Sequence, residues 1–267
     1  MPADGARNPA DDAGDSYVDA RCAAVYDIFE GPERDDLDVY AAMVEEFGAA
    51  SVVDVGCGTG TFATMLAGRG VEVVGVDPSA LALDVAQSKP HAGKVTWVHG
   101  IAADLPPLQA DMAFMTANVA QAILGDEAWA ETLTAIRRRL SPDGLLVFES
   151  RDPERQAWLE WTKEYTYSTA EVGGEGTVKS WVEFDAAHGA FVDFVGMLVF
   201  ERDGRRVERR SRLQFRDRAE LTKSLEDAGF VVDEIRDAPD RPGREFVFIA
   251  RKSQLIYQRN VDADQPR

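Results

Sequence analysis

The segment from Ser51 to Gly60, SVVDVGCGTG, constrains the fold more than any other part of the chain. A run of strand-forming residues ends at three glycines spaced two residues apart, and a helical pattern starts at Thr61. A strand, a glycine turn and a helix form the first half of a nucleotide-binding βαβ unit, where free N–H groups and the positive end of the helix dipole face the ligand. The dinucleotide pattern Gly-x-Gly-x-x-Gly is not met, because Thr61 stands where its last glycine belongs. We therefore expect a nucleoside ligand without a diphosphate.

The overall composition excludes several classes of protein. The chain has 267 residues, enough for one large α/β domain with an elaboration, and its 47 acidic and 29 basic residues give a formal net charge of −18. Such a charge argues against a surface that grips nucleic acid. The two cysteines, Cys22 and Cys57, match neither a disulfide framework nor a zinc spacing, and no apolar run reaches the ~20 residues of a membrane span. We expect a cytoplasmic monomer or homodimer with no metal, nucleic-acid or membrane partner.

Alternating apolar and helical patterns continue after the glycine segment. Strands are predicted at residues 51–55, 71–77, 95–99, 111–116, 145–150, 230–235 and 245–250, with helices between most of them. Residues 151–162 have a helical pattern. From 165 to 215, strands are separated by turns at Gly173-Gly174, Ala187-His188-Gly189 and Asp203-Gly204, which predicts an antiparallel insertion.

These patterns predict six regions along the chain. They are a disordered tail at 1–15, an N-terminal helical cap at 16–48, a cofactor-binding core at 49–150, a β-rich substrate-side insertion at 151–216, a closing helix and two strands at 217–252, and a second tail at 253–267.

Three motifs in this order resemble those of the class I S-adenosylmethionine-dependent methyltransferases of the small-molecule type. They are VDVGCGTG at 53–60, VGVDPS at 74–79, and LSPDGL at 140–145, just before the fifth strand. The resemblance implies an α/β fold with a Rossmann-like seven-stranded mixed sheet, order 3-2-1-4-5-7-6, in which strand 7 is antiparallel, helices cover both faces, and an antiparallel β insertion follows strand 5. It also implies S-adenosyl-L-methionine as cofactor and S-adenosyl-L-homocysteine as product.

The resemblance also implies which residues hold the cofactor. The methionine part would contact Asp54 and the loop Gly56, Cys57, Gly58, Thr59 and Gly60, and the ribose would contact Asp77, followed by Pro78 and Ser79. The remaining positions are Ala102, Ala103 and Asp104 beside the adenine, Ala117 and Asn118 near the donor methyl, and Tyr26 folding over the cofactor. Ile101 stands where the family commonly has an acid. The alternative roles are a turn-capping acid for Asp77, a simple loop carboxylate for Asp104 and a surface-helix aromatic for Tyr26.

The acceptor side is less specific. Candidate catalytic residues are Asn118, Gln121, Asp152 and Tyr17, while Asn118 and Gln121 are equally well explained as caps of the next segment. The histidines, His91, His99 and His188, do not follow strands four or five, where a general base is expected. We therefore predict in-line methyl transfer, mainly by proximity and orientation, to an N or O atom of a small molecule that needs little deprotonation, such as a neutral amine or an acidic phenol.

Two further patterns permit two interpretations each. The aromatics Trp158, Trp161, Tyr165 and Tyr167 either wall a substrate pocket or pack within the protein. Eight arginines lie between 201 and 218: Arg202, Arg205, Arg206, Arg209, Arg210, Arg212, Arg216 and Arg218. They either pair with acidic neighbours on a solvent face or bind an acidic substrate or partner. The competing functions are a non-catalytic S-adenosylmethionine-binding regulatory module and an NAD-dependent oxidoreductase.

Overall fold

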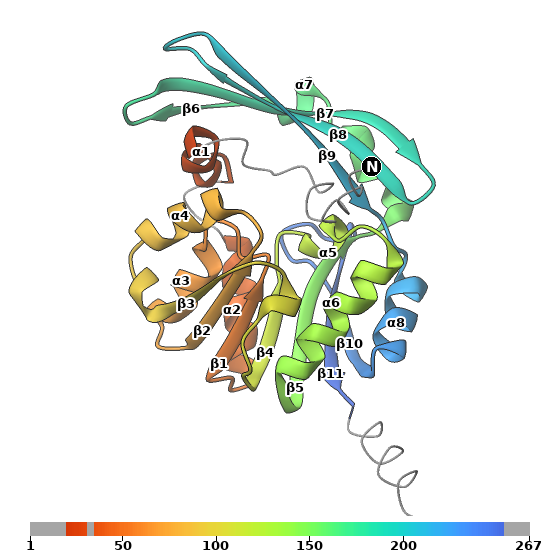
Figure 1. Cartoon of the computed structure of the whole chain (residues 1–267). Coiled ribbons are helices and arrows are strands. Elements are labelled where there is room, and N and C mark those ends of the chain that lie inside the picture. Colours follow the sequence, from red (N-terminus) through yellow and green to blue (C-terminus); the bar gives the residue numbers. More distant parts are fainter. Residues whose placement is uncertain (1–19, 31–34, 254–267) are drawn as a thin grey trace, which may run out of the picture.

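The computed structural model describes residues 20–30 and 35–253, and its strands form two sheets (Figure 1). The larger sheet has the strand order β10-β11-β5-β4-β1-β2-β3. Its strands are β1 (Ser51–Val55), β2 (Glu72–Asp77), β3 (Val95–His99), β4 (Ala110–Met115), β5 (Leu140–Arg151), β10 (Phe230–Asp237) and β11 (Glu245–Lys252). Strand β11 pairs antiparallel with both β5 and β10, whereas β1 to β5 pair in parallel. The predicted order and the reversed closing strand are confirmed.

Helices cover both faces of this sheet because its central strands are apolar on both sides. Helices α2 (Asp35–Glu46) and α3 (Thr61–Gly68) pack on the face that carries Phe114 and Val147. Helices α6 (Asp126–Arg139) and α8 (Arg218–Asp227) pack on the opposite face, around Phe148 and Phe248. Neighbouring residues of one strand therefore enter different core clusters, and the carboxyl ends of the strands remain as the edge where side chains converge.

The second sheet forms a roof over that edge. We call β6 (Ser168–Val172), β7 (Gly176–His188), β8 (Phe191–Phe200) and β9 (Arg205–Gln214) the roof sheet; they pair antiparallel in this order. Figure 1 shows α1 (Ala20–Glu30) between the roof sheet and α4 (Ala80–Ser88). Cys22 and Val25 of α1 are buried against Val178 and Phe200 of the roof sheet. The predicted insertion and its turns at Gly174, Gly189 and Gly204, each with positive φ, are present.

Two local predictions were wrong. The helix expected at 151–162 is replaced by the 3-10 turns η4 (Pro153–Arg155) and η5 (Ala157–Glu160), followed by the short helix α7 (Lys163–Thr166). Gln156 separates the turns with a φ of 47°, which a continuous helix does not accommodate. The turn expected at 141–144 lies inside β5, where Asp143 has a φ of 65° and the pairing with β4 shifts register.

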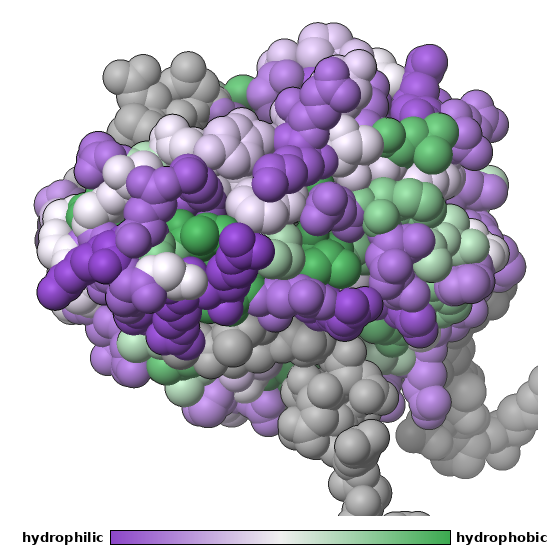
Figure 2. Space-filling view, turned by 90° about the horizontal axis from the view of Figure 1, so that it is seen from above, coloured by the Kyte–Doolittle hydropathy of each residue, from purple (hydrophilic) through white to green (hydrophobic). Residues whose placement is uncertain are grey.

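The remaining described elements are short: η2 (Ala92–Lys94), η3 (Ala102–Asp104) and α5 (Val119–Ala122). No helix in the described ranges has the length and apolar character that crossing a membrane requires. Figure 2 views the molecule of Figure 1 from above, and on this side hydrophilic residues separate small hydrophobic patches. The tail predicted at 1–15 and Tyr17 lie outside the described residues, and the division into regions stays a prediction.

Candidate active site

Asp54 lies in β1, just before the glycine loop, which we define as residues 56–60. Its side chain is 1% exposed, and neither carboxylate oxygen has a hydrogen-bond partner among the described residues. Burial, together with the charge of Asp77, raises the pKa of Asp54 to about 7. The backbone N–H of Ala63 lowers this pKa, although it does not have hydrogen-bond geometry to the carboxylate. An unpaired buried carboxylate is costly, so this position fits a cationic ligand group that would satisfy it.

Asp77, the last residue of β2, is oriented by two backbone donors. Gly58 N–H donates to Oδ2 and Ser79 N–H donates to Oδ1, both at 2.8 Å. These bonds fix the carboxylate beside the glycine loop. The turn-capping role of Asp77 is therefore present, and the ribose contact stays a prediction.

The first and last glycines of the loop are required by their neighbours as well as by backbone conformation. Gly56 and Gly60 have φ values of 71° and 75°, which favour glycine. A Cβ on Gly56 would lie 2.6 Å from Val119 Cγ1, and one on Gly60 would lie 2.5 Å from Trp97 Cη2. The contact with Val119 brings the post-β4 segment, residues 117–125, directly against the glycine loop.

The other loop residues contribute a buried thiol and a tether to α1. Burial and the charges of Asp54 and Asp77 raise the pKa of Cys57 well above its usual value, so the thiol stays protonated and is a poor nucleophile. Thr59 Oγ1 donates to Asp27 Oδ1 at 2.5 Å, and Asp27 also pairs with Lys89 Nζ at 2.5 Å. Lys89, which the sequence analysis did not single out, thus helps to hold α1 over the loop.

Residues predicted on the ribose and adenine sides are mostly engaged locally. Ser79 Oγ accepts from Ala82 N–H at 3.3 Å as the cap of α4, while Pro78 is exposed. Asp104 Oδ2 accepts from Ile101 N–H at 2.9 Å, which is the loop role foreseen as its alternative. Ala102 is buried and Ala103 is exposed. Tyr26, half-buried, packs against the α1–α4 contact, and its place over the cofactor stays a prediction.

The post-β4 segment starts with two residues in the left-handed region. Ala117 and Asn118 have φ values of 53° and 60°, a conformation that is uncommon outside glycine and is typical of functional sites. Asn118 N–H donates to Glu149 Oε1 at 2.9 Å. Its Nδ2 donates to Glu245 Oε2 at 3.2 Å and approaches Glu149 Oε1 at 3.4 Å. Its Oδ1 is buried without a partner.

Two buried carboxylates stand behind Asn118. Glu149 accepts a short hydrogen bond from the Tyr40 hydroxyl. Burial raises the pKa of Glu149; the hydrogen bond from Tyr40 opposes this shift, and the charge of Glu245 adds to it. Glu245 pairs with Arg241 at 2.7 Å and with Arg151 at 3.5 Å.

The sequence analysis missed three members of this network, Tyr40, Arg241 and Glu245. Two sequence features could have indicated members of this network: Glu245, an acid at the start of an otherwise apolar strand, and Tyr40, a phenol on the inward face of a helix.

Of the other catalytic candidates, Gln121 joins this network and Asp152 does not. Gln121 is 1% exposed; its Oε1 accepts from Arg151 Nη1 at 3.0 Å, and its Nε2 has no partner. Asp152 caps the next turn by accepting from Glu154 N–H at 2.9 Å.

A cavity of about 310 Å³ opens beside this network. It is lined by Arg151, Ala157, Glu160, Trp161, Tyr165, Thr166, Arg241, Arg244 and Glu245. The ring of Trp161 lies 5.1 Å from that of Phe194 in the roof sheet, and the Arg151 guanidinium lies 5.6 Å from the Trp161 ring. Of the four aromatics considered from sequence, Trp161 and Tyr165 line this cavity. Trp158 packs on Phe215, whereas Tyr167 packs near Trp181.

The arginines of the stretch 201–218 lie in different environments, some on the exposed face of β9 and one in the buried segment that follows it. Arg210 pairs with Asp185 and Glu208, and Arg212 pairs with Asp193, all on an exposed face. These two match the solvent-face interpretation.

Arg216 differs from them because it is 4% exposed and contacts the post-β4 segment. It donates to the carbonyl oxygens of Ala120, Ile123 and Gly125 and to Gln214 Oε1, at 2.8–3.4 Å. The end of β9 therefore holds the segment that carries Asn118.

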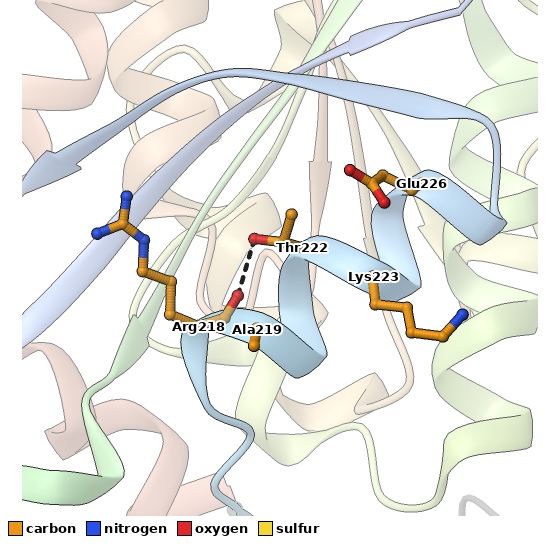
Figure 3. Close-up of a pocket in the computed structure, with 5 residues that line it drawn as sticks. All are labelled: Arg218, Ala219, Thr222, Lys223 and Glu226. Atoms are coloured by element: carbon orange, nitrogen blue, oxygen red, sulfur yellow. Dashed lines mark hydrogen bonds between the residues drawn. The ribbon is translucent and has the colours of Figure 1, made fainter.

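A second hollow lies on the outer surface of α8 (Figure 3). Its lining residues, Arg218, Ala219, Thr222, Lys223 and Glu226, all come from this helix. The hydrogen bond drawn there, from Thr222 Oγ1 to Arg218 O, is internal to the helix. Because side chains from different elements do not converge on it, we place the site at the carboxyl edge instead.

Comparisons with known proteins identify methyltransferases as the similar proteins. A model of a methyltransferase domain matches residues 52–144. A relative from Geobacillus sp. (strain WCH70), named as a methyltransferase, is 26% identical over 241 residues, which is 86% of this chain and 94% of the relative. The solved structure of the CcbJ methyltransferase from Streptomyces caelestis is 25% identical with a TM-score of 0.69, over 86% of this chain and 96% of that one. The sugar N-methyltransferase KedS8 from Streptoalloteichus sp ATCC 53650 shares the fold at 19% identity, with a TM-score of 0.69 over 95% and 99% of the two chains.

Proposed function

We propose, from the premise that this chain belongs to the class I S-adenosylmethionine-dependent methyltransferases, that it methylates a nitrogen or oxygen atom of a small molecule. The family assignment confirms the enzyme class and the cofactor predicted from the sequence. The observation that carries the proposal is the packing of Val119 against Gly56, because it sets the post-β4 segment beside the loop that would hold the cofactor.

The residues present fit this cofactor. Asp54, buried and without a partner among the described residues, suits the ammonium of the methionine part, and Asp77, at the end of β2 beside the glycine loop, is the acid that we propose for the ribose hydroxyls. The bound cofactor supplies a methyl group on a sulfonium centre, which is already activated for displacement. The task left to the protein is to hold the acceptor atom in line with that methyl and to exclude water.

A nucleophile that needs little deprotonation is supported by the positions of the histidines. His99 Nε2 lies 3.0 Å from Pro78 O, His188 ends β7, and the His91 ring packs beside Gly68. All three lie outside the post-β4 segment and the end of β5, so an imidazole base is not available there. Asp152 is occupied as a cap, although its carboxylate remains a candidate base.

The small-molecule acceptor is supported by the size and setting of the cavity. A space of about 310 Å³ with one aromatic wall and several charged side chains suits a compact polar molecule. The solved relative KedS8 is described as a sugar N-methyltransferase, and this fits the same class of acceptor. A monomeric or homodimeric state, and the absence of nucleic-acid and membrane partners, remain part of the proposal.

A transfer assay with an isotopically labelled methyl donor tests this function. The purified chain is incubated with a panel of small amines, hydroxyl compounds and phenols, and label is measured in small-molecule, protein and nucleic-acid fractions. We expect label in the small-molecule fraction together with S-adenosylhomocysteine, and none with Asp77→Ala. Label found only in the protein or nucleic-acid fraction would contradict the proposal.

A further inference from the structure

Asn118 and Gln121 each have a buried side-chain amide. In each amide one polar atom is hydrogen-bonded, and the other has no partner among the described residues. Asn118 and Gln121 are 3% and 1% exposed. Among the described residues, Asn118 Oδ1 and Gln121 Nε2 have no hydrogen-bond partner. Asn118 is the N-cap of α5 and Gln121 lies within it, so the two amides belong to the same short segment after β4. Buried polar atoms are nearly always paired in folded proteins, and two orphans in one short segment beside a cofactor loop point to a ligand.

In each amide, the partner of the paired atom determines whether the unpaired atom is a hydrogen-bond donor or an acceptor. Asn118 Nδ2 faces Glu245 and Glu149, so a flipped amide would set its oxygen against two carboxylates. Gln121 Oε1 accepts from Arg151, so its orientation is fixed as well. Asn118 therefore offers a hydrogen-bond acceptor and Gln121 offers a donor.

The topology sets the Asn118 oxygen towards the cofactor loop. Glu149 and Glu245 belong to β5 and β11, which lie on one side of β4, and the glycine loop follows β1 on the other side. The two branches of a planar amide diverge, so Oδ1 points away from β5 when Nδ2 points towards it. The next residue, Val119, contacts Gly56 directly, so Asn118 lies one residue from the contact with the cofactor loop.

We propose that the acceptor is a primary or secondary amine with a neighbouring oxygen atom, whose N–H donates to Asn118 Oδ1 and whose oxygen accepts from Gln121 Nε2. This proposal rests on the proposed function and narrows its acceptor from a nitrogen or oxygen atom to an amine of the amino-alcohol or amino-sugar type.

The chemistry favours an amine over a hydroxyl at this position. The nitrogen lone pair forms the new N–C bond while the C–S bond of the donor breaks, and the electron pair of that bond stays on sulfur. The product is an ammonium, and its N–H donates more strongly to Asn118 Oδ1 as positive charge develops. One proton of the ammonium then leaves to water. A hydroxyl would need a base, whereas the Glu149 oxygens are engaged by Tyr40 and Asn118.

A binding experiment tests the Asn118 contact without knowledge of the natural acceptor. The probe is a cofactor analogue in which a C–NH3⁺ group replaces the S⁺–CH3 group, and the reference ligand is S-adenosylhomocysteine, which lacks it. Calorimetry gives the ratio of the two affinities, so general effects on cofactor binding cancel. We expect the wild type to prefer the amine analogue by about tenfold, corresponding to about one charge-assisted hydrogen bond.

The variants are chosen to keep the backbone unstrained. Asn118→Gly removes the amide but tolerates the positive φ, and it should bring the ratio to about one. Gln109→Leu removes an exposed amide at the opposite end of β4 and should keep the wild-type ratio. Equal affinities in the wild type, or a preference that survives in Asn118→Gly, would overturn the Asn118 contact. Failure of both ligands to bind would instead count against the proposed function.

The Gln121 contact is tested by acceptor preference. Each amino alcohol in the labelled-transfer panel is paired with its deoxy analogue and with its tertiary amine. We expect the wild type to use the amino alcohol at least about tenfold better than the deoxy analogue and to leave the tertiary amine unmodified. Gln121→Leu should abolish the first preference and keep the second. Equal use of the tertiary amine, or an acceptor methylated only on a hydroxyl, would overturn the assignment.

Discussion

The two sides of the site are built in different ways. The cofactor side consists of a short backbone loop and two acids at the ends of adjacent strands, and one of those acids, Asp54, has no partner in the described residues. The proposed acceptor side consists of side chains from separate elements joined by hydrogen bonds: Tyr40 of α2, Asn118 before α5, Glu149 of β5 and Glu245 of β11. Within the described residues, Asn118 Oδ1 is the atom of this network that has no partner. The cofactor side therefore has a buried carboxylate without a partner among the described residues. On the acceptor side, hydrogen bonds within the protein already orient the side chains.

This difference has a physical reason. The cofactor is constant and carries its own charge, so a loop of glycines and two carboxylates is sufficient to bind it. The acceptor must be held in line with the methyl group, and that requires side chains fixed by a supporting network. The contact between Gly56 and Val119 joins the two sides.

The largest effect is expected on the cofactor side. Asp77→Ala removes the carboxylate that we propose as the acceptor of two ribose hydroxyls. Charge-assisted hydrogen bonds contribute about 1.5–3 kcal/mol each, so S-adenosylhomocysteine should bind about 1000-fold more weakly. Asp84→Ala, an exposed acid on α4, is the matched control and should leave the affinity unchanged. Calorimetry measures both. A loss of less than tenfold in Asp77→Ala would mean that Asp77 serves mainly as a turn cap.

On the acceptor side, the largest loss should come from a residue that touches no ligand. Arg216→Met leaves the carbonyl oxygens of Ala120, Ile123 and Gly125 without their donor, and the free energy of unfolding should fall by about 3 kcal/mol. Arg212→Met, which breaks an exposed pair with Asp193, should leave the free energy of unfolding nearly unchanged.

Denaturant titration and hydrogen exchange check the Arg216 prediction. Exchange should accelerate at residues 119–125 in Arg216→Met. Equal losses in the two arginine variants would show that the buried guanidinium does not support the post-β4 segment.

A smaller effect is expected where the two sides meet. Gly56→Ala combines a positive φ with a Cβ 2.6 Å from Val119, and we expect a loss of about 2 kcal/mol in unfolding free energy. Val119→Ala in the same chain should recover about half of that loss, because it relieves the clash and not the backbone strain. A double-mutant cycle measures the coupling. Strictly additive losses would mean that the contact does not connect the two sides.

The same contrast explains what the sequence predicted. The strand order, the reversed closing strand and the roof sheet follow from local periodicity and turn residues, and all three are present. The acids Asp54 and Asp77 could be proposed as cofactor ligands from sequence because the glycine loop and the next strand follow one another closely in the chain. Tyr40 and Glu245, by contrast, are separated by 205 residues in the chain and meet only through sheet topology. The helix expected at 151–162 is absent because Gln156 adopts a left-handed conformation, which glutamine as a residue type does not predict.

The central claim is that the buried carboxylate of Asp54 receives the cationic end of the cofactor. With a pKa near 7, this group is mostly protonated at pH 6 and mostly ionised at pH 8. The raised value also means that the ligand-free protein loses stability as pH rises from about 4 to about 7, because the native state keeps a proton that the unfolded chain releases.

The most direct test is the affinity for S-adenosylhomocysteine, measured by calorimetry at pH 6 and pH 8 on the wild type and Asp54→Asn. We predict that the wild-type affinity rises about tenfold between the two pH values, because only the carboxylate form pairs with the ligand ammonium, and that Asp54→Asn shows no such rise. A pH-independent wild type, or the same rise in Asp54→Asn, would contradict this assignment of Asp54.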